Sequence, residues 1–131
     1  MVILNPTEGI SFGKVDNLDD MYRIIGCDTI DIATRNVGGK PFDFIIDDEG
    51  WLKADPQVSA VWSSRTHAGY IEPAFVGTLI ICSHDSEGNT IDISLDDHMF
   101  LCEKLTTLFV KDTDTGNIRK NTVIQLDDWR W

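Results

Sequence analysis

Polar and apolar residues alternate along several short stretches of the chain, which is the pattern of half-buried strands. The clearest alternation covers residues 28–34, and the Gly38-Gly39 pair that follows is a hairpin signal. Residues 42–46 are the expected return strand. Residues 75–83 have the continuous apolar centre of a central strand, and residues 90–94 are predicted to pair with them. Further short strands are expected over residues 2–4, 10–15, 108–111 and 118–126.

Two other stretches have apolar residues at the helical period. Residues 17–25 place Leu18, Met21 and Ile25 on one face, and Gly26 can supply the left-handed stop. Residues 95–105 follow a capping serine, Ser94, with the same period. A third, shorter helix is predicted over residues 56–62, because Pro56 suits a first helical position.

Hairpins that follow one another in sequence indicate antiparallel pairing, so the fold class is α+β. We expect a mainly antiparallel sheet built from hairpins, with two or three helices packed on one face. The 131 residues are the usual length of one domain. A single domain is therefore predicted over residues 1–131, in which residues 107–131 add an extra hairpin and a short tail.

Acidic residues outnumber basic ones by 22 to 11, and the net charge is −11. This charge repels nucleic-acid phosphates and anionic membranes, so neither is expected to bind directly, and it favours a protein partner with a basic surface. Caps of helices and turns are the favoured interpretation of the paired acids, and an acidic binding surface is the functional one. Most of the charge lies in two stretches, whose candidate partner-binding residues are Asp43, Asp47, Asp48, Glu49, Asp85, Glu87, Asp92, Asp96, Asp97 and Glu103.

Two tryptophans, Trp129 and Trp131, stand within the last three residues. They either fold back on the sheet or dock on a partner or a second subunit, since tryptophan is a favoured interface anchor. A homo-oligomer formed through the C-terminal tail is one of these alternatives.

Aromatic and basic residues also gather in the middle of the chain. Such a set could line a pocket that sequesters a nucleotide or another small molecule, which is the alternative function. Its candidate residues are Trp51, Trp62, Arg65, His67 and Tyr70.

Cys82 and His84 share a face of a strand, and His98 and Cys102 share a face of a helix. Two thiols and two imidazoles are a tetrahedral zinc set. Their spacing is not that of a zinc finger, so buried thiols with histidines at the solvent edge are the favoured interpretation. Accordingly, we expect no metal and no cofactor.

Catalytic motifs are weak. Ser63, Ser64 and His67 are the residue types of an activated serine, with Asp55 upstream, but no GxSxG elbow is present. The Asp112-x-Asp114-x-Gly116 stretch departs from a calcium loop and is expected to be a plain turn. The protein is therefore predicted not to be an enzyme.

The three cysteines form no CxxC pair, which favours reduced thiols and a cytoplasmic location. No apolar run approaches the ~20 residues of a membrane span. The first residues also lack the basic region of a secretory signal.

Five stretches, residues 24–26, 29–32, 44–50, 58–60 and 76–81, carry a family resemblance. Over residues 11–100 the chain resembles a family of small phage, plasmid and gut-bacterial proteins catalogued as a domain of unknown function. The resemblance implies no catalytic residues and places such proteins among the accessory genes of mobile elements. With the charge, it suggests a non-enzymatic accessory protein that binds and inhibits a host protein, such as a defence or nucleic-acid-handling protein, through an acidic surface in the host cytoplasm.

Overall fold

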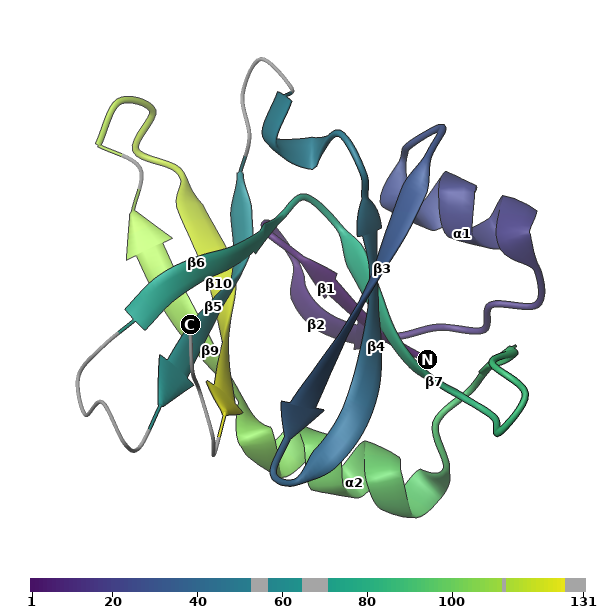
Figure 1. The fold of residues 1–131 in the computed structure, drawn as a ribbon. Coiled ribbons are helices and arrows are strands. Elements are labelled where there is room, and N and C mark those ends of the chain that lie inside the picture. The colour runs from purple at the N-terminus through teal and green to yellow at the C-terminus, as the bar shows by residue number, and fades with distance from the viewer. Residues whose placement is uncertain (53–56, 65–70, 112, 127–131) are drawn as a thin grey trace.

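Two β-sheets and two α-helices form the fold in a computed structural model of the chain, which describes residues 1–52, 57–64, 71–111 and 113–126 (Figure 1). The first sheet has six strands in the order β2-β1-β7-β4-β3, with β8 paired to the end of β7, and every pair is antiparallel. Its strands are β1 (Val2–Asn5), β2 (Gly9–Phe12), β3 (Ile30–Val37), β4 (Lys40–Asp47), β7 (Leu79–His84) and β8 (Thr90–Ile91).

The second sheet has four strands in the order β6-β5-β10-β9. Strands β5 and β10 are parallel, and the other two pairs are antiparallel. The β9–β10 hairpin is the predicted C-terminal hairpin, and β10 is an inner strand of this sheet. The strands are β5 (Val58–Ser64), β6 (Ile71–Val76), β9 (Leu105–Lys111) and β10 (Ile118–Leu126).

Both long helices lie where their periodicity predicts them. In α1 (Leu18–Ile25), the Asn17 side chain accepts the Asp20 amide (2.9 Å), and left-handed Gly26 (φ 76°) donates to the Tyr22 carbonyl (2.8 Å). In α2 (Leu95–Lys104), the Ser94 hydroxyl accepts the Asp97 amide (3.1 Å). A short 3-10 helix, η1 (Gly50–Leu52), follows β4. Among the described residues, every helix falls short of the length and apolarity that crossing a membrane requires.

Strand β7 is buried on both faces, and its side chains alternate between two hydrophobic clusters. Leu79 and Ile81 belong to an inter-sheet core, whose buried residues are Val2, Leu4, Val37, Phe42, Phe44, Ala60, Phe75, Leu79, Ile81, Ile93, Leu101, Leu105 and Ile124. Ile80 and Cys82 belong to an α1 core, whose buried residues are Met1, Met21, Ile25, Ile45, Ile80 and Cys82.

The α+β class and the mainly antiparallel pairing are confirmed, but the sheet is divided in two. Helix α1 contributes to the α1 core, whereas Leu101 of α2 contributes to the inter-sheet core on the other side of β7. The prediction that the helices pack on one face is therefore not confirmed. Figure 1 shows α1 beside the first sheet and α2 beneath the ends of both sheets.

Two local predictions are wrong. Residues 58–62 are part of strand β5 rather than a helix, because Val58-Ser59-Ala60 and their neighbours pair with β6 and β10 on both sides. Residues 75–83 are not one strand. Gly77 has a left-handed backbone (φ 72°) and donates to the Gln57 carbonyl (2.8 Å), so the chain leaves the second sheet there and enters the first.

We predict that Phe44→Ala destabilises the protein by about 3–5 kcal/mol, because the Phe44 side chain is fully buried and stacks on Phe75 with ring centroids 5.3 Å apart. Phe109, which is 67% exposed, is the matched control, and Phe109→Ala should change stability by less than about 0.5 kcal/mol. Urea unfolding of the two variants measures both effects. Equal losses would contradict the described core.

Candidate functional site

A groove of about 290 Å³ opens on the outer face of the first sheet, beside the start of α1. We call it the α1 groove. Most of its lining is apolar, and its polar residues come from the segment before α1 and from β8. The lining residues are Met1, Val15, Asp16, Asn17, Leu18, Met21, Ile30, Ile32 and Thr90.

Two large apolar side chains of the α1 groove remain half exposed. Leu18 is 51% exposed and Ile32 is 48% exposed. Leu18 is the first residue of α1, whereas the helix buries Met21 and Ile25. Ile32 lies on the edge strand β3, two residues after Ile30 and therefore on the same, outer face of the strand. Isolated exposed apolar residues are ordinary, but a groove that brings two of them together is a candidate docking site.

Carboxylates lie on two sides of the α1 groove. Asp16 lines it, and Asp19 and Asp20 occupy the first turn of α1. On the other side, Asp92 forms a 2.9 Å ion pair with the amino group of Met1, and Met1 itself lines the groove. Asp85 belongs to the β7–β8 turn, next to the strand that contributes Thr90. Part of this charge is balanced within the chain, since Lys14 lies 3.8 Å from Asp16 and Arg23 lies 3.1 Å from Asp20. The remaining negative charge beside an apolar groove favours ligands that combine an apolar group with positive charge.

Asp43 is the predicted partner-binding residue that the structure removes from the surface. Its side chain is 5% exposed, the Thr34 hydroxyl donates to Oδ1 (2.6 Å), and His84 Nδ1 lies 2.9 Å from Oδ2. Because a carboxylate only accepts hydrogen bonds, Nδ1 of His84 carries the proton. A buried carboxylate satisfied in this way has a structural role: it joins β3, β4 and β7 on the outer face of the first sheet.

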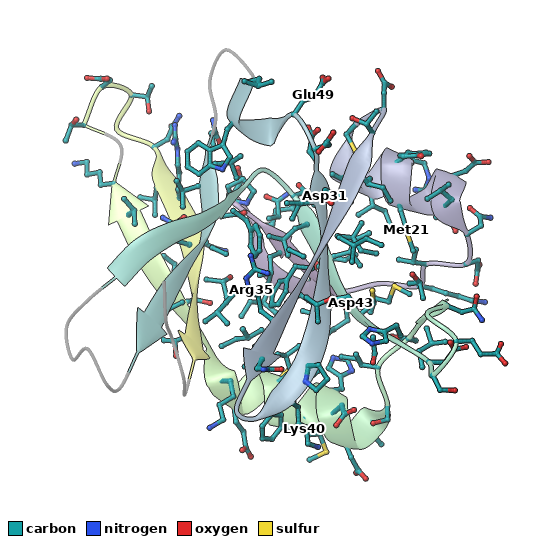
Figure 2. The ribbon with its side chains drawn as sticks, viewed as in Figure 1. Met21, Asp31, Arg35, Lys40, Asp43 and Glu49 are labelled. Atoms are coloured by element: carbon teal, nitrogen blue, oxygen red, sulfur yellow. The ribbon has the colours of Figure 1, made fainter. Side chains whose placement is uncertain are left out.

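The other predicted acids are spread over the molecule. Asp47, Asp48 and Glu49 lie at the end of β4. Asp97 belongs to α2 and lies beside the beginning of β4, where its carboxylate is 2.8 Å from Nζ of Lys40. The eight residues of β4 separate these two groups by roughly 25 Å, given the rise of a strand. Figure 2 shows Glu49 and Lys40 at opposite ends of the molecule, so Asp97 of the second acidic stretch lies far from the acids at the end of β4.

Several of these acids have the capping and turn roles of the favoured interpretation. The Asp85 carboxylate accepts hydrogen bonds from the main-chain amides of Glu87 and Asn89. The hydrogen bond from the main-chain amide of Asn89 makes the largest contribution to lowering the pKa of Asp85. The hydrogen bond from Lys40 lowers the pKa of Asp97. Asp96 lies in the first turn of α2, and Glu103 is exposed near its end. The tail with Trp129 and Trp131 lies outside the described residues.

The four-residue zinc set is not assembled. Cys82 is buried, His84 is bonded to Asp43, and Cys102 is exposed on α2. The ring of His98 packs against Phe12 with centroids 4.4 Å apart. Within the part of the chain that the structure describes, no three candidate ligands lie close enough to hold a metal ion.

Two of the five residues of the predicted small-molecule pocket fall within the described residues. Trp51 is 56% exposed on η1, and Trp62 lies on β5. Arg65, His67 and Tyr70 lie outside the described residues. A separate cavity of about 490 Å³ is lined by Thr7, Gln57, Thr115, Asn117, Ile118 and Arg119, and this described lining includes no aromatic ring on which a base could stack.

The fold and the groove define an α+β protein with two packed sheets and a largely apolar groove on one of them. A family model described as "Domain of unknown function (DUF3846)" matches residues 1–109, so the chain belongs to this family. The match extends beyond the predicted residues 11–100 at both ends and stops within β9. Searches of the curated proteins and of the solved structures give no significant match.

We predict that Cys82 resists alkylation at pH 8 in the folded protein. Burial, with Asp43 as the next contribution, raises the pKa of the Cys82 thiol to about 12, so the reactive thiolate is scarce at that pH. Exposed Cys102 should be modified first. Because no lysine or arginine lies between Cys82 and Cys102, mass spectrometry of Asp-N peptides after a timed iodoacetamide reaction checks this order. Urea should make Cys82 reactive. Equal labelling of the two thiols without urea would show that the α1 core is open.

We predict that Asp43→Asn destabilises the protein by about 1–3 kcal/mol, because an amide cannot accept from Thr34 and His84 at both positions. Asp48→Asn at an exposed position should change stability by less than about 0.5 kcal/mol. Thermal unfolding of both variants at neutral pH provides the comparison. A neutral result for Asp43→Asn would refute the structural role.

Proposed function

We propose that this protein is a non-enzymatic binding protein whose partner is a protein with a basic surface, and that a basic segment of the partner docks in the α1 groove. The observation that carries this proposal is the half-exposed pair Leu18 and Ile32 between two acidic borders. In the proposed complex an apolar side chain of the partner fills the groove. Lysine or arginine residues beside it face Asp16 and Asp92.

The charge around the α1 groove, more than its size, supports a side-chain anchor rather than a nucleotide. Its volume of about 290 Å³ is at the lower end of the range of small-molecule sites, which begins at roughly 300 Å³. Its borders are acidic, which disfavours the phosphates of a nucleotide. The sequestering function therefore ranks second, and no described contact favours it over partner binding.

The charge of the whole chain supports the same partner class. A net charge of −11 steers basic proteins toward the surface at long range, and this steering weakens as salt rises. The acids need not form one patch for this purpose, since those beside the α1 groove supply the local complementarity.

The accessory-gene context implied by the resemblance motivates two finer parts of the proposal. The partner is a host protein, and binding inhibits it by covering its basic surface. The reduced state expected of the three cysteines is consistent with binding in the host cytoplasm.

We predict that Leu18→Lys abolishes partner retention in affinity capture from a bacterial lysate, because it places a positive charge on the apolar wall of the α1 groove. Leu52→Lys is the matched control, since Leu52 is 83% exposed on η1 and is not among the residues that line the groove. The wild type and the control should retain the same basic protein, identified by mass spectrometry. Retention should fall between about 0.1 M and about 1 M salt, where the Debye length shortens from about 10 Å to about 3 Å.

Retention of that protein by Leu18→Lys at the wild-type level would place the binding surface elsewhere. Retention that salt leaves unchanged would remove the electrostatic part of the proposal. A capture experiment that retains no basic protein at low salt would overturn the proposed function.

A further inference from the structure

Strand β3 is an edge of the first sheet. It pairs with β4 over its whole length, from Ile30 opposite Asp47 to Val37 opposite Lys40, and β4 is its only strand neighbour in the described sheet. Residues 31, 32 and 34–36 are all exposed. Figure 2 shows Asp31 and Arg35 along β3 at the front of the molecule. An eight-residue edge without proline is long enough to receive another strand.

Two hydrogen bonds identify the main-chain groups that face away from β4. The Ile32 amide donates to the carboxylate of its neighbour Asp31 (2.9 Å), and the Thr34 carbonyl accepts from the guanidinium of Arg35 (2.9 Å). In an antiparallel ladder, alternate residues direct their main-chain groups to opposite sides. Ile32 and Thr34 therefore present their amides and carbonyls on the open side of β3.

The charges on this edge are symmetric about Ala33. Asp31 and Arg35 each lie two residues from it, on the same face of the strand and with opposite signs. When an antiparallel strand of the same sequence pairs with β3 about Ala33, Asp31 stands opposite Arg35 of the other strand, and Arg35 stands opposite Asp31. Ile32 stands opposite Thr34 of the other strand. The main-chain amides and carbonyls on the open side of each strand therefore face one another.

We propose that β3 is a self-association edge, on which a second copy of this chain pairs its own β3 antiparallel, with the two-fold axis at Ala33. Each Ile32–Thr34 pair exchanges both main-chain hydrogen bonds, and each Asp31–Arg35 pair forms a cross-strand ion pair. The small Ala33 side chain suits the axis, where the two strands approach closely. A register shifted by two residues loses both ion pairs, so the charges select this one.

The side chains of Asp31 and Arg35 also provide hydrogen-bond partners for the open edge of β3 in a single copy. In one copy Asp31 and Arg35 satisfy the outward amide of Ile32 and the outward carbonyl of Thr34. On pairing, the main chain of the second copy takes over these bonds and releases the two side chains for each other. The association is therefore reversible and depends on concentration, unlike that of an obligate dimer. It is distinct from association through the C-terminal tail.

We predict that sedimentation velocity of the full chain, over a dilution series from millimolar to micromolar, detects a monomer–dimer equilibrium. Asp31→Arg and Arg35→Asp each place like charges opposite one another twice in the dimer, so each should raise the dissociation constant at least about tenfold. The double variant restores both pairs with reversed polarity, and its dissociation constant should return to within about threefold of the wild type.

Asp96→Arg is the matched control, because Asp96 is exposed on α2 and its replacement makes the same change in net charge as Asp31→Arg. It should leave the dimer unchanged. Circular dichroism melting identifies any variant that fails to fold, and the double variant then serves as the test. A wild type that stays monomeric at millimolar concentration would overturn the proposal. So would single variants that dimerise like the wild type, or a folded double variant that does not recover. Ile32 belongs to both the α1 groove and this edge. Leu18→Lys changes the groove outside β3 and should leave the dimer unchanged, which keeps the two proposals distinguishable.

Discussion

Strand β7 is buried on both faces, and its alternating side chains connect the two hydrophobic cores. Leu79 and Ile81 hold the second sheet and α2 on one side, and Ile80 and Cys82 hold α1 on the other. The two helices are therefore separated by the first sheet. Because α1 has only eight residues, it covers part of the outer face and leaves Leu18 and Ile32 half exposed at its border. The α1 groove is a direct result of this incomplete coverage.

Much of the fold follows from local sequence. The Asn17 cap, the Gly26 stop and the Gly38-Gly39 turn each determine a backbone geometry within a few residues, and the elements they bound lie where the pattern predicts. Strand β5 is not predicted, because Pro56 suits the start of a helix and the strands that pair with β5 include one far away in sequence. Its pairing with β10 joins residues 58–64 to residues 118–126, and no local period reports such a contact.

The candidate site was less accessible to sequence reasoning. Asp43 belongs to an acidic stretch, but the turn at Gly38-Gly39 places it opposite Thr34, and that register could have indicated a buried bond. Its other partner, His84, comes from β7. That contact can be predicted only when the order of the strands in the sheet is known. Leu18 and Ile32 fit the core pattern of their elements, so their exposure follows only from how far α1 reaches across the sheet.

Occupation of the α1 groove by an apolar anchor beside basic residues can be observed by amide and methyl NMR. The labelled protein is titrated with the basic segment of the captured partner. We expect the largest chemical-shift changes at Leu18, Met21, Ile30 and Ile32, with smaller ones at Asp16 and Asp92. Changes confined to α2, or to the acids at the end of β4, would contradict occupation of the groove.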